Sequence, residues 1–151
     1  MSQHKSLLIL PHQLYDPKYY PKEVKDIYLY EHPQYFKKYN FNQKKLVLHR
    51  ASMKKYEDLL QKKKYNVTYL EFDKTLKIPS NYCIFDPIDK INFKPKPQEI
   101  LESPNFLLTK EDYTKYRKKS DKFMFQAFYM FGKKINDIIP TIKSQDKLNR
   151  Q

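Results

Sequence analysis

Four residues that can transfer protons follow short apolar segments of the chain. His12 comes after SLLILP, Glu31 and His32 come after DIYLY, and Asp86 comes after YCIF. If these segments are neighbouring strands, their ends meet at one edge, and the four side chains could converge into a chromophore-binding or catalytic cluster. Polar residues also commonly cap strands without any such role, and position alone is only an analogy. Both interpretations stay open from the residues alone.

Two further groups carry similar alternatives. His49 and Arg50 could bind a phosphate, or could extend along the interface between a helix and another domain. Phe128 and Tyr129 belong to an aromatic run, 123–131, that could stack on bases. Packing, either on the sheet or against another domain, is the alternative, since contiguous apolar surface usually marks an interface. The four histidines and the single Cys83 predict no metal site, since a cysteine-based zinc or iron–sulfur site needs more thiols.

Composition excludes some classes of function. The 151 residues include one glycine, Gly132, so neither a P-loop nor a dinucleotide-binding GxGxxG motif exists. The formal net charge is +13, which would attract nucleic acid. The abundance of Lys, Asn, Tyr, Ile and Phe is equally typical of an AT-rich genome, so the charge has two explanations. The chain has no membrane-span-length apolar run and no signal peptide, and we expect a soluble intracellular protein, cytoplasmic or nuclear.

Apolar periodicity predicts the elements that position these residues. Strands are expected at 6–10, 26–31, 67–72, 82–85 and 105–108. Asn42 is the expected N-cap of a helix in which Leu46, Met53 and Leu60 recur every seven residues, with Leu48, Ser52 and Leu59 as a neighbouring row. Further helices are expected within 94–103, entered through proline, and over 110–118, capped by Thr109. The last element, from Asp121 to residue 139, is an aromatic helix ended by Pro140.

Strands that alternate with helices predict an α/β fold, an open parallel five-stranded sheet flanked by helices, with the aromatic helix at the C-terminus. One domain is expected over residues 1–139, followed by a linker, 140–151. Ligands bind such sheets beyond the carboxyl ends of the strands. His12, Gln13, Glu31 and Asp86 would lie there.

Several segments carry a resemblance to a known family. They are LILPHQL, DIYLYEHPQYF, NFNQKKLVLHRASMKKYEDLL, YNVTYLEF, FLLTKEDYTKY, MFQAFYMFGKKINDI and the tail SQDKLNRQ. In order and spacing they resemble the N-terminal antenna domain of deoxyribodipyrimidine photolyase-related proteins, in the bacterial photolyase and cryptochrome branch that carries an iron–sulfur cluster. The resemblance covers essentially the whole chain.

The resemblance implies a Rossmann-like domain attached to a larger helical domain, which in the family binds FAD and the cluster and receives the DNA lesion. That catalytic domain is missing from this chain, so the resemblance implies a truncated remnant or one part of a split protein. The expected partner is a separately encoded flavin-binding helical domain. FAD and the cluster are expected only in that partner. Asn149 and Arg150 match the family's segment leading into it.

The resemblance also implies a lumazine-type antenna pigment at the strand ends. Gln13 matches a family glutamine, and Glu31 matches its acidic residue after the second strand. Pro11 and His12 replace the family's usual Gly-Asp, and Ile88 stands near a frequent glycine. These changes should narrow the pocket and remove one polar anchor. His12, Gln13, Glu31 and Asp86 are the candidate chromophore-binding residues.

Two functions from different classes follow. The first is a photolyase-related α/β domain that is not catalytic alone and docks on a flavin domain in light-dependent DNA repair or light sensing. The second is a basic module that binds nucleic acid through the charge around Lys44 and Lys45. Candidate interdomain or nucleic-acid contacts are His49, Arg50, Phe128, Tyr129, Asn149 and Arg150. A small α/β enzyme is the weakest hypothesis, because no nucleophile and base occur in a recognisable arrangement.

Overall fold

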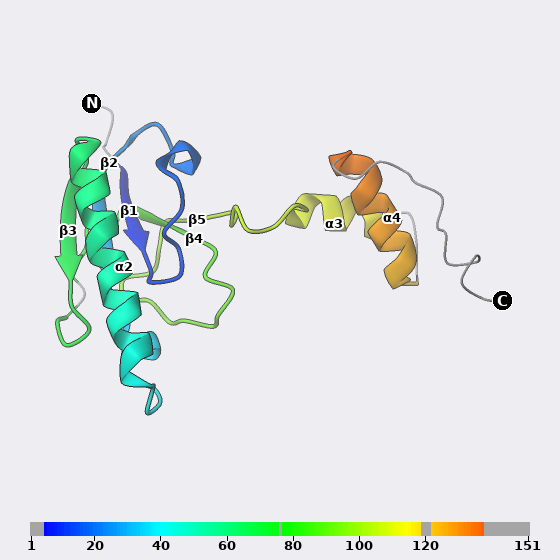
Figure 1. Cartoon of the computed structure of the whole chain (residues 1–151). Helices are drawn as coiled ribbons and strands as arrows, with labels where there is room; N and C mark the ends of the chain where they lie inside the picture. The colour runs from blue at the N-terminus through cyan, green and yellow to red at the C-terminus, as the bar shows by residue number, and fades with distance from the viewer. Residues whose placement is uncertain (1–4, 76, 119–121, 138–151) are drawn as a thin grey trace. The chain divides into compact units, whose positions relative to one another are not determined.

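The computed structural model describes residues 5–75, 77–118 and 122–137. The chain divides into two compact units, Met1–Pro104 and Asn105–Gln151. The elements of both are labelled in Figure 1. The linker predicted at 140–151, with Asn149 and Arg150, lies outside the described residues.

The first unit is a five-stranded sheet in which all paired strands are parallel, as the sequence predicts. Its order is β3-β2-β1-β4-β5. The strands are β1 (Lys5–Ile9), β2 (Val24–Tyr30), β3 (Asn66–Leu70), β4 (Tyr82–Phe85) and β5 (Glu99–Leu101). The chain builds outward from β1 to β3, then returns to the other side of β1, so the sheet has a switch point between β1 and β4.

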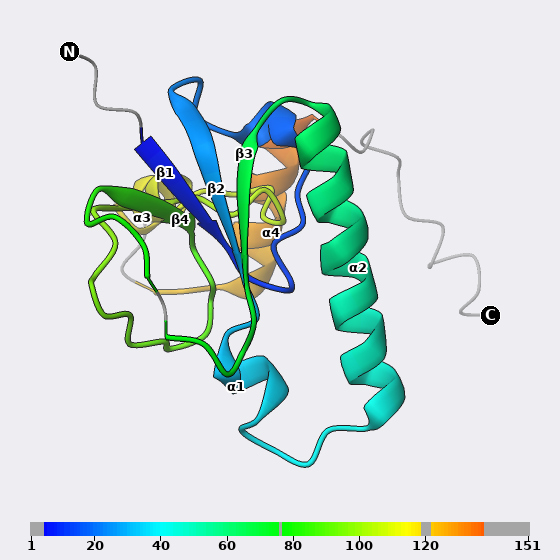
Figure 2. The ribbon, with the colours of Figure 1, turned by 90° about the vertical axis from the view of Figure 1, so that its left-hand side faces the viewer.

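The connections after β1 and β2 contain the short helices of this unit and one long helix. A 3₁₀ turn, η1, spans Pro17–Tyr19, and α1 spans Pro33–Phe36. The long helix α2 covers Gln43–Lys62, and the Asn42 side chain caps it by accepting a hydrogen bond from the Lys44 N–H. Figure 2 shows α2 beside the sheet, with α1 and the start of α2 at the end toward which the strands run.

The buried side of α2 is narrower than the sequence predicts. Met53 and Leu60 are fully buried and Tyr56 nearly so, which confirms that row of the helix. Leu48 and Leu59, the predicted neighbouring row, are 67% and 41% exposed. Only one stripe of a helix surface can pack against a sheet. The row with Leu48 and Leu59 therefore points outward together with the lysines.

The sheet separates two apolar clusters, because side chains alternate along each strand. The cluster on the α2 side includes Leu7, Ile9, Ile27 and Leu29. The other side, which includes Leu8, Tyr82 and Ile84, is covered by residues such as Ile78, Ile91 and Phe93 from the long connections around β4. Cys83 is fully buried in β4, and its thiol donates to the Ser6 carbonyl at 3.4 Å.

Two predicted elements are wrong. The expected helix within 94–103 is instead β5, which pairs with β4 in the register Ile84↔Ile100. The strand expected at 105–108 is absent; that segment is irregular. Proline beside charged residues resembles a helix start, but the open edge of β4 can bind an extended segment. Leu107 and Leu108 of that segment instead lie beside residues of the C-terminal helix.

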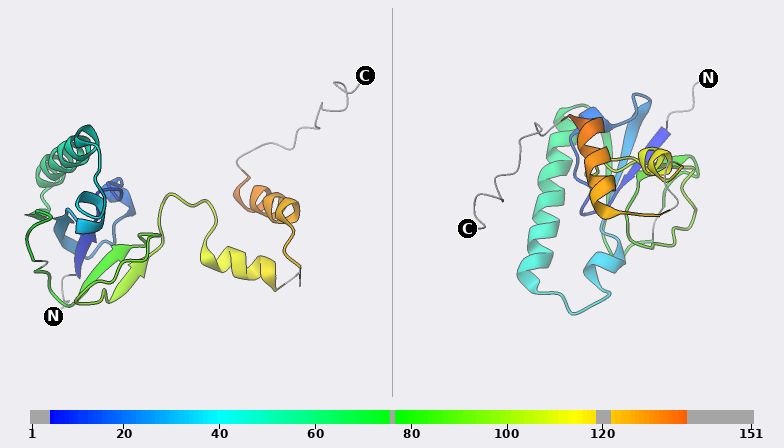
Figure 3. Two further views of the ribbon diagram at one scale, coloured as in Figure 1. Left: turned by 90° about the horizontal axis from the view of Figure 1, so that it is seen from below. Right: turned by 90° about the vertical axis from the view of Figure 1, so that its right-hand side faces the viewer.

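The second unit is a pair of helices, α3 (Lys110–Arg117) and α4 (Phe125–Asn136), seen from two sides in Figure 3. Thr109 and Asp112 form a capping box at the start of α3 through reciprocal hydrogen bonds, which confirms the predicted cap at Thr109. Tyr116 packs on Phe128 and Phe131, with ring centroids 5.1 and 5.4 Å apart. Aromatic contacts therefore hold α3 to α4.

Candidate functional site

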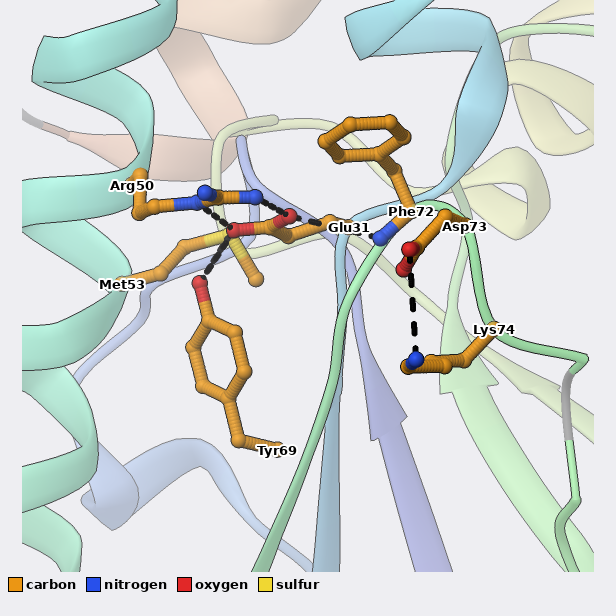
Figure 4. Close-up of polar contacts among 7 residues, drawn as sticks. All are labelled: Glu31, Arg50, Met53, Tyr69, Phe72, Asp73 and Lys74. Carbon is orange, nitrogen blue, oxygen red and sulfur yellow. Dashed lines mark hydrogen bonds and ion pairs between the residues drawn. The ribbon is translucent and has the colours of Figure 1, made fainter.

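Glu31 is the centre of a polar cluster at the carboxyl end of β2. Its side chain is fully buried and accepts four hydrogen bonds (Figure 4). Arg50, on α2, donates Nε–H to Oε1 at 2.6 Å and Nη2–H to Oε2 at 2.5 Å. The Tyr69 hydroxyl donates to Oε1 at 2.6 Å, and the Phe72 backbone N–H donates to Oε2 at 3.3 Å. The cluster ties α2, β2 and the end of β3 together.

The electrostatics of this cluster favour the ionised form of Glu31. Burial alone would raise the pKa of the carboxyl group, but the hydrogen bonds from Arg50 and Tyr69 outweigh it and lower the pKa. The same contacts raise the pKa of Arg50, chiefly through its hydrogen bond to Glu31. A carboxylate that is ionised and fully hydrogen-bonded is a poor proton acceptor, so its geometry fits a structural anchor better than an acid–base role.

Gln13 has a comparable structural position after β1. It is fully buried, its Nε2 donates to the Phe85 carbonyl at 2.8 Å, and its Oε1 accepts from the Leu10 N–H at 3.3 Å. These bonds join the ends of β1 and β4 at the switch point. Gln13 and Glu31 are the polar residues that the resemblance implies for a lumazine-type pigment, and the polar groups of both are hydrogen-bonded within the protein. The arrangement therefore does not fit such a pigment.

His12 lies at the same switch point in an aromatic setting. Its ring centroid is 5.0 Å from that of Tyr35, whose hydroxyl donates to Asp89 at 2.7 Å. Both ring nitrogens of His12 are buried, and neither has a hydrogen-bond partner within the described residues. Burial lowers the pKa of His12, and the nearby Pro87 carbonyl and Asp89 offset this only in part. The neutral imidazole is thus favoured.

His32 and Asp86 both stabilise turns at this edge. His32 Nδ1 accepts from the Gln34 N–H at 3.2 Å at the start of α1, and burial lowers the pKa of this histidine. Asp86 Oδ1 accepts from the Ile88 N–H at 3.0 Å. Ile88 has φ 66°, the left-handed region that glycine adopts more easily, at the position where the resemblance implies a frequent glycine.

The structure brings Glu31 and Arg50 together, although the sequence assigns them to different groups. His49 instead lies against Phe36, with ring centroids 6.3 Å apart. Phe128 and Tyr129 lie on α4 in the second unit. Tyr69, Tyr35 and Phe72 were not identified from the sequence. Tyr69 is opposite Leu29 in the β2–β3 register, two residues before Glu31, so a correct strand pairing could have indicated it.

Within the described ranges, no group of three or more His, Cys, Asp or Glu residues could hold a metal ion. No helix among residues 5–75, 77–118 and 122–137 combines the length and apolar character that crossing a bilayer requires.

Acidification should destabilise the first unit through His12. Because burial lowers the pKa of His12 below its ordinary value of 6.5, the unfolded chain binds more protons between those two values. The free energy of unfolding should therefore fall as pH decreases from 6.5 through the lowered pKa. Urea unfolding at several pH values would measure it. In His12→Phe this pH dependence should be weaker; an unchanged slope would contradict the prediction, and the remaining slope would report His32 and His49, whose pKa values burial also lowers.

A parallel sheet with a switch point, covered by one long helix, defines a Rossmann-like α/β protein. Residues 7–90 match the family model described as deoxyribodipyrimidine photo-lyase-related protein. The chain is also 32% identical, over 181 aligned positions, to an uncharacterized protein of Acanthamoeba polyphaga mimivirus, with 95% of this chain and 92% of the viral protein covered. The chain belongs to the deoxyribodipyrimidine photolyase-related protein family.

Proposed function

We propose that this protein is the α/β part of a photolyase-related assembly in light-dependent DNA repair or light sensing. It is not catalytic alone and docks on a flavin-binding helical domain of a second polypeptide. The viral relative is matched over 92% of its length, which leaves little of that protein outside the shared segment. Family membership and a short relative together favour a division of the assembly between chains.

The observation that carries the docking proposal is the apolar face of α4. Within the second unit none of the helix's residues is buried, and Phe125, Tyr129 and Met130 are 76%, 50% and 50% exposed. Exposed apolar surface on this scale is typical of an interface. This is the surface that the predicted interdomain residues Phe128 and Tyr129 belong to.

A groove along α4 gives this surface a shape. It has a volume of about 270 Å³ and is lined mainly by apolar side chains of α4 and of the irregular segment before α3, including Leu107, Leu108, Phe125 and Phe128. Gly132 leaves space at the base of the groove, because a Cβ at this position would lie 3.1 Å from Cδ1 of Leu108. Lys133 lies beside it. A helix with an apolar ridge flanked by acidic residues would fit this groove.

The test is binding to the purified flavin-binding helical domain of a photolyase-related protein from the same source. We expect co-elution in size-exclusion chromatography, followed by flavin absorbance. Phe125→Asp should weaken binding about 30-fold, because aromatic residues at the centre of interfaces contribute about 2 kcal/mol. Phe125 is 76% exposed, so this change should leave folding intact.

Tyr19→Ser is the matched control, an exposed aromatic residue of η1 in the first unit. It should bind as the unmodified protein does. If the flavin domain and this chain elute separately at all concentrations, or if both variants weaken binding equally, the docking proposal fails.

A further inference from the structure

We infer that α1, the loop 37–42 and the first turns of α2 form a surface that binds the phosphate backbone of nucleic acid. This α1–α2 basic surface consists of Lys37, Lys38, Lys44 and Lys45. The inference rests on charge and geometry in the first unit and is independent of the docking proposed for α4.

The first observation is a long interval without acidic residues. Between Glu31 and Glu57 the chain has six lysines, one arginine and no Asp or Glu. The flanking Glu31 is fully buried and hydrogen-bonded to Arg50, so it exposes no negative charge on the surface. Compositional enrichment in lysine alone does not produce this segregation, because the chain as a whole has 17 acidic residues.

The second observation is the pairing of the lysines. Three lysines of unit 1 lie in ion pairs, Lys5 with Glu99, Lys54 with Glu57 and Lys74 with Asp73. Across the described residues, no carboxylate lies within ion-pair distance of the four lysines of the α1–α2 basic surface, which are Lys37, Lys38, Lys44 and Lys45. Their charge is therefore neutralised only by solvent ions, which a polyanion would displace.

The third observation is that aromatic rings position these ammonium groups. Lys37 lies over Phe72 at 4.8 Å, Lys45 lies over Phe41 at 4.8 Å, and Lys38 lies over Tyr39 at 5.3 Å. Cation–π contacts restrain flexible side chains, so less entropy is lost when they meet phosphates.

The last observation is that lysines lie at the amino end of α2, where positive charge lowers the stability of the helix. The first turn of α2 contains Lys44 and Lys45 and no acidic residue, although the amino end of a helix is already electropositive. Figure 2 shows that α1 and this helix end lie at the same end of the unit. A bound phosphate backbone would turn an unfavourable arrangement into a favourable one.

The test is fluorescence-anisotropy titration of the full chain with labelled duplex DNA, single-stranded DNA and RNA at several salt concentrations. The variant changes Lys37, Lys38, Lys44 and Lys45 to Gln. The matched control changes Lys22, Lys25, Lys62 and Lys63 to Gln, an equal loss of charge near the start of β2 and the end of α2. The three ligands distinguish the source of the phosphates.

We expect binding of at least one ligand that weakens steeply with salt. The surface variant should lose roughly 100-fold in affinity at low salt and lower the salt slope by about 3, since each phosphate contact adds close to one unit. In the control variant, the affinity and the salt slope should both change much less. Thermal unfolding should show the surface variant to be at least as stable as the unmodified chain, which excludes misfolding.

Two results would overturn the inference. One is no binding of any of the three ligands at low salt. The other is an equal loss in the surface variant and the control, which would show that net charge alone, and not this surface, attracts nucleic acid. Replacing the same four lysines with arginine should keep the affinity.

Discussion

Replacing Arg50 with methionine should lower the free energy of unfolding by about 3 kcal/mol, because it leaves the buried Glu31 carboxylate without its charged partner. Removing one member of a buried ion pair typically lowers the free energy of unfolding by about 3–5 kcal/mol. The lower end applies here since 43% of the Arg50 side chain is exposed and Tyr69 and Phe72 still donate to Glu31. Urea unfolding followed by circular dichroism would measure the loss.

A double-mutant cycle separates the ion pair from simple loss of packing. Glu31→Gln combined with Arg50→Met leaves a neutral amide instead of an isolated charge. The double variant should be more stable than the sum of the single changes implies. Additive losses, or an Arg50→Met variant as stable as the unmodified chain, would show that Glu31 does not depend on Arg50.

Leu60→Ala should destabilise the first unit by about 3 kcal/mol, while Leu59→Ala should cost less than about 0.5 kcal/mol. The two leucines are adjacent in α2, but Leu60 is fully buried against the sheet and Leu59 is 41% exposed. Denaturant midpoints of the two variants give the comparison. Equal losses would mean that both rows of the helix are covered, as the sequence pattern implied.

Sequence reasoning succeeded where one physical signal dominates. The continuous apolar segments at β1 and β4 are typical of strands buried on both faces, and the polar atoms of Asn42 and Thr109 mark helix starts. It failed at β5, where Pro95 and Pro97 suggested a helix. Whether Glu99–Leu101 extends depends on the neighbouring β4 edge, which is a tertiary property that no local pattern contains.

The polar site was harder to predict than the strands. Glu31 was identified because it follows an apolar strand, but its partner Arg50 lies 19 residues away on a helix. Tyr69 was missed because alternation in β3 fixes which face a side chain takes and not which group it meets. Contacts between elements follow from register and helix placement, and the sequence specifies these only through the assembled fold.

The placement of Cys83 makes this residue a chemical probe for opening of the sheet in the first unit. This residue is the chain's sole cysteine, it is fully buried in β4, and burial raises the pKa of its thiol to about 11. Alkylating reagents attack thiolates, so they should modify Cys83 only in molecules whose sheet has opened. Labelling rates would thus record opening of the sheet alone, even when the helical pair melts separately.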